Sequence, residues 1–257
     1  MDYPEILHLH KFYGFNTNSL SALIKGTLWF SKPATLNDPF DIDIVDFAYA
    51  MTPAGFSHMI QILKVQAGIL PERANLLKQL EKEIPDQKAL DEMTQNISAK
   101  FREDRKDWGV FCLCESYKNI LMWSHYADKH KGFCVRFARN ADNRLGDLEY
   151  TRPVSYSCEY PCPDLWSAKG LGRIYDELFF TKAKCWEYER EWRMLNDKGN
   201  IELPLAEFTS ISCIIFGLNM PVAHRETIRR ILSDKEEIEF HEAVKVPNRF
   251  ELDIVQC

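Results

Sequence analysis

The chain has 257 residues, of which 46% are hydrophobic and 27% charged, so it has the composition of a globular protein large enough to bury a core. A formal net charge of −6 argues against broad, non-specific binding to nucleic acid. No stretch approaches the roughly 18 consecutive apolar residues of a membrane span. The acidic start at residues 1–5 lacks the features of a signal peptide. These features predict a soluble, cytoplasmic protein that does not associate with membranes.

The eight cysteines favour reduced thiols over disulfides or a metal centre. Cys112, Cys134 and Cys213 lie in apolar, strand-like runs, as expected of small buried side chains. Cys158 and Cys162 are four residues apart, but no second pair follows at the spacing of a zinc site. We therefore expect mostly buried, reduced cysteines and no bound metal.

The first 40 residues predict a strand, a helix and a second strand. Residues 6–12 suit a strand, and residues 16–25 carry a helical apolar stripe that Thr17, Asn18 or Ser19 could cap. Gly26 is placed to end this helix, and residues 27–31 form the second strand.

A helical insert is predicted between residues 53 and 107, because apolar residues recur there at helical spacing. Pro71 and Pro85 separate three helices. These helices are expected at residues 59–67, 77–84 and 90–101. The insert has no catalytic-looking group, so we interpret it as a lid or a surface for a protein partner.

Strand and helix patterns alternate in the remainder of the chain. The expected strands are residues 110–114, 132–137, 153–157, 211–216, 238–246 and 250–255, and the expected helices are residues 119–128, 171–182 and 221–232. We therefore predict a single α+β domain over residues 1–257. It should have a mixed, mainly antiparallel sheet with flanking helices, and residues 53–107 as its insert.

The segment from Cys185 to Met194 is the most informative part of the sequence, and we predict a strand there. Its alternation places Trp186, Tyr188, Trp192 and Met194 on one face and Glu187, Glu189, Glu191 and Arg193 on the other. Three carboxylates in a row repel one another unless a cation or a ligand offsets them. The acidic face is therefore either solvated and neutralised by nearby basic residues, or part of a functional site.

Three further groups could carry chemistry, and each also has a plain structural interpretation. His8 and His10 share a face of the first strand, with Lys11 pointing the other way. Asn37 and Asp38 precede Pro39 and favour a rigid turn. In the helix at residues 119–128, core packing is expected for most side chains. Its candidate site residues are Trp123, His125 and Tyr126.

Three motifs together resemble a known bacterial family, "domain of unknown function 2971". They are residues 30–41 (FSKPATLNDPFD), residues 122–127 (MWSHYA) followed by residues 131–134 (KGFC), and residues 186–193 (WEYEREWR). The resemblance runs from about Leu7 to Gly217 and names no reaction. It implies a possible role in defence against phage, which is suspected for members of this family.

A weaker resemblance does imply a reaction. ADP-ribosyltransferases have a polar residue on an opening strand, then a helix, then a strand that bears Ser or Tyr, and later a Glu-x-Glu. The chain has His10 or Lys11, a helix, Ser31 and Glu189-x-Glu191 in that order. It has no clear Ser-Thr-Ser motif.

The second resemblance implies that NAD is a substrate and that its ADP-ribose passes to water, a protein or a nucleic acid. Glu191 would stabilise the oxocarbenium-like centre, and Glu189 would be the base for the acceptor. Arg193 or Lys11 would hold the diphosphate. Tyr126 or Trp123 would stack on the nicotinamide. The expected nucleotide site is completed by His10, Ser31, Asn37, Asp38 and His125.

Two alternatives remain open. One is a metal-dependent phosphodiesterase or nuclease, in which Asp38, Asp41, Glu189 and Glu191 would hold magnesium. The other is a non-catalytic sensor or adaptor that binds a ligand in the same place and contacts a partner through the helical insert.

Overall fold

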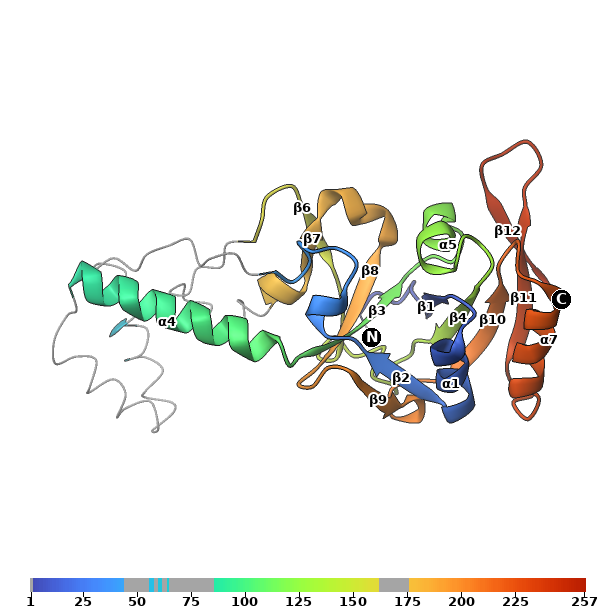
Figure 1. Cartoon of the computed structure of the whole chain (residues 1–257), viewed down its shortest axis with the longest axis horizontal. Coiled ribbons are helices and arrows are strands. Elements are labelled where there is room, and N and C mark those ends of the chain that lie inside the picture. The colour runs from blue at the N-terminus through green and yellow to red at the C-terminus, as the bar shows by residue number, and fades with distance from the viewer. Residues whose placement is uncertain (1, 44–55, 58–59, 62–63, 65–85, 162–175) are drawn as a thin grey trace. The chain divides into compact units, whose positions relative to one another are not determined.

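A computed structural model describes residues 2–43, 56–57, 60–61, 64, 86–161 and 176–257. The chain divides into two compact units, the first comprising residues 1–36, 108–156 and 184–257 and the second residues 37–107 and 157–183. The predicted α+β class is confirmed (Figure 1). Every helix within the described ranges is too short or too polar to cross a membrane.

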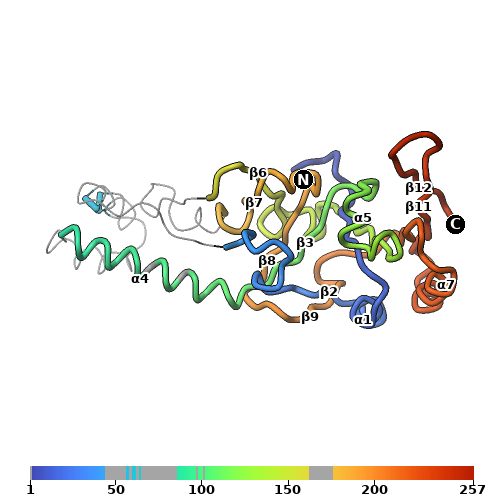
Figure 2. The backbone as a smooth tube through the Cα atoms, turned by 45° about the horizontal axis from the view of Figure 1, so that its top comes forward, coloured from blue at the N-terminus to red at the C-terminus, as the bar shows by residue number. Residues whose placement is uncertain are grey.

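An eight-stranded sheet forms the centre of the first unit (Figure 1). From one edge to the other its strands are β12 (Leu252–Gln256), β11 (Glu239–Lys245), β10 (Ile211–Phe216), β4 (Phe133–Ala138), β1 (His8–Tyr13), β3 (Gly109–Cys114), β8 (Glu191–Asn196) and β5 (Thr151–Pro153). All neighbours are antiparallel except β10 and β11. The helix α7 (Val222–Ile231) connects this parallel pair, because parallel neighbours need a crossover. Figure 2 shows α7 beside β11 and β12.

The helix α1 (Thr17–Lys25) has the boundaries that its capping residues dictate. Its N-cap is Asn16, one residue before the predicted caps, and the Asn16 side chain accepts a hydrogen bond from the Ser19 backbone at 3.0 Å. Gly26 ends the helix in the left-handed region with φ 62°, as predicted. The strand β2 (Thr27–Phe30) follows and pairs with β9 (Ile201–Pro204).

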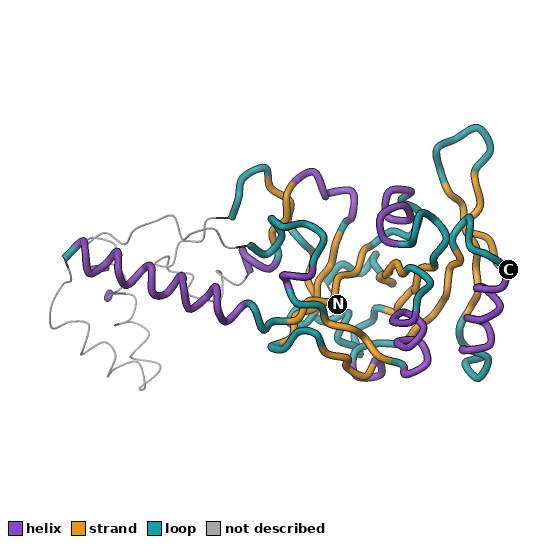
Figure 3. The backbone as a smooth tube through the Cα atoms, in the orientation of Figure 1, coloured by secondary structure: helices purple, strands orange, loops and turns teal. Residues whose placement is uncertain are grey.

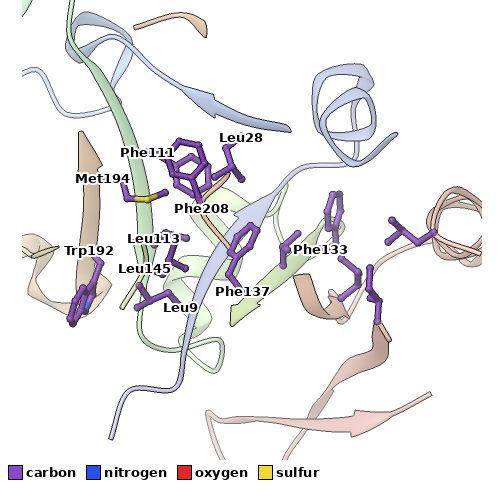
Figure 4. Packing of buried hydrophobic residues seen from close by; sticks show 14 of the residues in the cluster. Leu9, Leu28, Phe111, Leu113, Phe133, Phe137, Leu145, Trp192, Met194 and Phe208 are labelled. Atoms are coloured by element: carbon purple, nitrogen blue, oxygen red, sulfur yellow. The ribbon is translucent and has the colours of Figure 1, made fainter. Parts of the chain in front are cut away.

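The two faces of the large sheet bury different side chains. On one face lies an aromatic and aliphatic core that includes Phe111, Phe137, Trp192 and Met194 (Figure 4). Residues of α1, α7 and β2 pack into this core. On the other face, Trp123 and Met122 from α5 (Ile120–Tyr126) pack over strand side chains. These include Phe12, whose ring lies 4.9 Å from that of Trp123 between centroids.

Several predicted elements differ from the structure. The predicted strand 153–157 is two short strands, β5 and β6 (Ser155–Ser157). Pro221 is the N-cap of α7 rather than its first helical residue. The predicted helix 171–182 is wrong at its end, because β7 (Thr181–Ala183) is a strand. The sequence did not predict β9 or the short 3-10 helices at Pro33–Thr35 and Leu205–Glu207.

The long helix α4 (Gln87–Arg105) belongs to the second unit and confirms the third helix of the predicted insert (Figure 3). Asp86 caps it, accepting a hydrogen bond from the Ala89 backbone at 2.8 Å. Leu90 is fully buried against Phe56. The predicted helix 77–84, and most of the one at residues 59–67, lie outside the described residues.

Candidate functional site

The acidic segment is not one continuous strand, so this prediction was wrong. A 3-10 helix, η2, covers Lys184–Glu189, and β8 begins only at Glu191. Between them Arg190 adopts φ 45°, in the left-handed region. Two side chains from outside this segment stabilise the turn. Asn119 Nδ2 donates to the Tyr188 carbonyl at 2.7 Å. The Glu191 backbone N–H also donates to the Tyr156 hydroxyl at 2.7 Å.

Glu191 and Arg193 form a buried ion pair on one face of β8. The Arg193 Nε and Nη2 atoms donate to the two oxygens of Glu191 at 2.7 and 3.0 Å. Glu191 is 4% exposed and Arg193 has no exposed surface. The predicted sharing of a face by these two residues is therefore correct. The guanidinium, however, is engaged with a carboxylate and is not presented to a diphosphate.

Cys112 and Cys114 of β3 lie directly across from this ion pair. Cys112 pairs with Arg193 in the strand register, and Cys114 pairs with Glu191. Burial, and then the Glu191 carboxylate, raise the pKa of the Cys112 thiol. Burial likewise raises the pKa of Cys114. Both thiols are therefore protonated neighbours of the carboxylate rather than nucleophiles.

Glu189 is the second buried carboxylate, with 4% of its surface exposed. The Tyr126 hydroxyl donates a hydrogen bond to Glu189 Oε1 at 2.5 Å. Tyr126 is the last residue of α5, so this bond joins the helix to the acidic turn across 63 positions of the sequence. The bond therefore brings together two of the three family motifs, residues 122–127 and residues 186–193, on one face of the sheet.

Aromatic rings surround this junction. His125 lies 6.4 Å from Trp186 and 6.3 Å from Tyr188 between ring centroids, and Trp186 lies 6.0 Å from Tyr188. His125 is exposed, and the two η2 rings are half-buried. We call these rings, with Tyr126, the aromatic platform. The sequence did not predict it, because the strand interpretation turned Trp186 and Tyr188 toward the core.

His10 lies in line with Glu191 across the sheet. The strand registers form one transverse row: Glu191, Cys114, His10, Arg136, Cys213 and Glu239. The His10 imidazole is buried against the ring of Tyr117, at 4.9 Å between centroids. Burial lowers the pKa of His10 to about 3, so its ring is neutral at neutral pH.

Ser31 is not brought to the two carboxylates. Lys11 lies on the opposite face of the sheet, although the Glu191 charge raises the pKa of Lys11 against the larger lowering by burial. Strand alternation directs Lys11 to the face opposite His10, where its Nζ lies 4.4 Å from the centre of the Phe111 ring. Lys11 Nζ also donates to the Cys112 carbonyl at 2.8 Å. Ser31 forms an isolated bridge with Val110. Val110 is four residues from Cys114, which corresponds to about 13 Å along β3.

The remaining predicted site residues have structural partners of their own. Trp123 is fully buried, and its Nε1 donates to the Tyr117 carbonyl at 2.7 Å, so it has no exposed ring to offer a ligand. Asn37 and Asp38 belong to the second unit. Asp38 accepts a hydrogen bond from the Phe40 backbone at 2.9 Å, which confirms the predicted turn.

The fold and this cluster define an α+β protein with two buried carboxylates beside an aromatic platform. Residues 122–194 match the model of the family described as "Protein of unknown function (DUF2971)", so this segment carries the sequence pattern of that family. The match runs from within α5 to within β8, and it confirms the family resemblance. Neither a curated protein nor a solved structure matches the chain.

Proposed function

We propose that this protein cleaves the nicotinamide–ribose bond of NAD and passes ADP-ribose to water or to another acceptor. The observation that carries the proposal is the pairing of two buried carboxylates, Glu189 and Glu191, next to a partly exposed aromatic platform. Carboxylates kept out of water interact more strongly with a developing positive charge. Loss of cellular NAD would suit the role in phage defence that the family resemblance suggests.

In the hydrolytic reaction, NAD and water are the only reactants. The bond between ribose C1′ and the nicotinamide nitrogen breaks, and its electron pair neutralises the pyridinium. A water oxygen then forms a bond to C1′ and loses one proton to a carboxylate. The products are ADP-ribose, nicotinamide and a proton. In the transfer reaction, an acceptor nucleophile takes the place of water.

Glu191 is the residue that we assign to the oxocarbenium-like ribose. Its two oxygens are held by Arg193, which fixes the carboxylate and makes Arg193 a positioning residue. We assign the proton-accepting role to Glu189, whose carboxylate is oriented by the Tyr126 hydroxyl.

The aromatic platform is assigned to the planar ring of the nucleotide. Stacking of a flat heterocycle on partly exposed rings supplies apolar contact in a defined orientation. The half-buried Trp186 and Tyr188 rings replace Trp123 in this role, since Trp123 is enclosed in the core.

Release of nicotinamide from NAD by the purified chain tests the proposal. We expect Glu191→Gln to lower the rate by about 100-fold or more, because its neutral amide removes the charge that stabilises the transition state. Glu187→Gln is the matched control. Glu187 lies in the same turn with an exposed side chain, so its rate should match that of the unchanged chain.

Glu191→Gln also leaves the Arg193 charge in a buried place, so each variant needs a melting curve at the assay temperature. Glu189→Gln gives a second measurement, because a glutamine oxygen can still accept the Tyr126 hydrogen bond. Full turnover by folded Glu191→Gln, or no turnover by any form of the chain, would contradict the proposal. Cleavage of a phosphodiester substrate that EDTA abolishes, without release of nicotinamide, would instead favour the metal-dependent phosphodiesterase.

A non-catalytic ligand-binding protein is the second candidate. Arg193 and Tyr126 already compensate the two carboxylates, as they would in a purely structural cluster. For this candidate, NAD or a related nucleotide should raise the melting temperature without being consumed. Alanine at Trp186 should remove that shift.

A further inference from the structure

The far end of the transverse row holds a thiol, a carboxylate and an imidazole. Cys213 lies on β10, and Glu239 lies beside it in the parallel register of β11. His241 follows two residues later and therefore points to the same face as Glu239. One ligand atom from each of these three side chains lies within 4.8 Å of the others.

We propose that Cys213, Glu239 and His241 bind a divalent transition-metal ion of the zinc class. Cys213 Sγ lies 3.4 Å from His241 Nδ1. Two ligands of one tetrahedral zinc ion, at about 2.3 Å for sulfur and about 2.0 Å for nitrogen, are separated by roughly 3.5 Å. The thiol and the ring are therefore already at the spacing that a shared ion requires.

The carboxylate is held beside them by a second layer of contacts. Arg136 Nη2 donates to Glu239 Oε2 at 2.8 Å, and Arg136 Nε donates to the Ser212 hydroxyl at 3.0 Å. Such outer contacts orient metal ligands in known sites. Glu239 Oε2 also lies 3.7 Å from His241 Nε2, so the carboxylate borders the imidazole ring. The Glu239 side chain is 53% exposed, which gives the ion a path to the buried thiol.

The donor set selects the class of ion. Thiolate and imidazole favour zinc and cobalt, whereas magnesium and calcium take oxygen ligands. Binding converts the Cys213 thiol to a thiolate and releases one proton. Three protein ligands leave a fourth position for water.

This site is separate from the carboxylates of the proposed function. Five strand steps of about 4.8 Å each, or roughly 24 Å, lie between Glu191 and Glu239 along the row. The metal proposal therefore does not depend on NAD cleavage, and each can fail alone.

Titration of the metal-free chain with Co²⁺ tests the site. We expect one equivalent to bind, with an absorption band from charge transfer between thiolate and cobalt, and Zn²⁺ to displace it. Cys213→Ser should remove the band, and His241→Ala should weaken binding by about 100-fold or more. His241 is partly exposed, so its variant guards against a Cys213 variant that fails to fold. Cys134→Ser, another buried thiol on the neighbouring strand β4, should bind as the unchanged chain does.

Two outcomes would overturn the metal site. The first is the absence of a thiolate band at excess Co²⁺. The second is a band that persists at full strength in both Cys213→Ser and His241→Ala, since it would then arise from an exposed cysteine such as Cys158, Cys185 or Cys257.

Discussion

His10 couples the stability of the sheet to pH. Its pKa falls from 6.5 to about 3 on folding because burial disfavours the charged ring. Below pH 6.5 the unfolded chain takes up a proton that the folded chain refuses, so the free energy of unfolding decreases as the pH falls toward 3. The slope from this one group approaches about 1.4 kcal/mol per pH unit within that window.

Chemical denaturation between pH 7 and pH 4 measures this effect. We expect His10→Gln to lose less stability than the unchanged chain over the same interval, since glutamine does not titrate. The carboxylates act alike in both proteins and cancel in the difference. Equal slopes for the two proteins would show that the pKa of His10 does not change on folding.

For single residues, the sequence predicted which residues belong to the site better than it predicted their hydrogen-bond partners. Glu191 and Arg193 are two positions apart on a strand, so alternation alone places them together. The bond from Tyr126 to Glu189 joins residues 63 positions apart. It depends on how α5 packs over the sheet, which no local pattern contains.

The backbone is tightly constrained in the turn between α5 and β4. Asp128, Lys129 and His130 all have positive φ values. Gly132 then passes so close to β1 that an added Cβ would lie 2.0 Å from the Tyr13 carbonyl oxygen. The backbone of Gly132 donates to Ala127 at 2.8 Å and accepts from Gly217 at 2.9 Å, so it cannot shift easily.

Gly132→Ala should therefore lower the free energy of unfolding by about 3 kcal/mol or more, at the upper end of overpacking effects. Gly14→Ala is the control, because a Cβ there meets its nearest atom at 3.5 Å, an ordinary contact. Urea denaturation of both variants makes the comparison. Similar stability for the two would mean that the turn can relax without cost.

Elements with strict alternation were predicted to within a residue or two, as for β1, β3, β4 and β10. Each has one apolar face in the larger core, so its periodicity is clear. The strand β9 was missed because it is short and pairs with β2, which lies far earlier in the chain. The acidic turn was misassigned because Asn119 and Tyr156 stabilise a conformation that its own alternation does not indicate.

Among the described residues, each of the two units has a hydrophobic cluster of its own. The core of the first unit lies on both faces of the eight-stranded sheet. In the second unit, Leu90 of α4 packs on Phe56, with Ile60 and Met93 beside it. The sequence predicted α4 of the second unit, but not that residues 157–183 belong to this unit. Residues so distant in sequence give no local signal of their association.

Separate cores predict separate responses to mutation. Leu90→Ala should cost about 2 to 5 kcal/mol, because it removes a fully buried side chain and leaves a cavity. Amide exchange in α4 should then accelerate by roughly 20-fold or more, while exchange in β4 stays unchanged. Hydrogen exchange followed by mass spectrometry resolves both elements. Gln95→Ala on the exposed face of α4 is the control and should leave both rates near their original values. Equal acceleration in α4 and β4 would mean instead that the two units unfold as a single cooperative body.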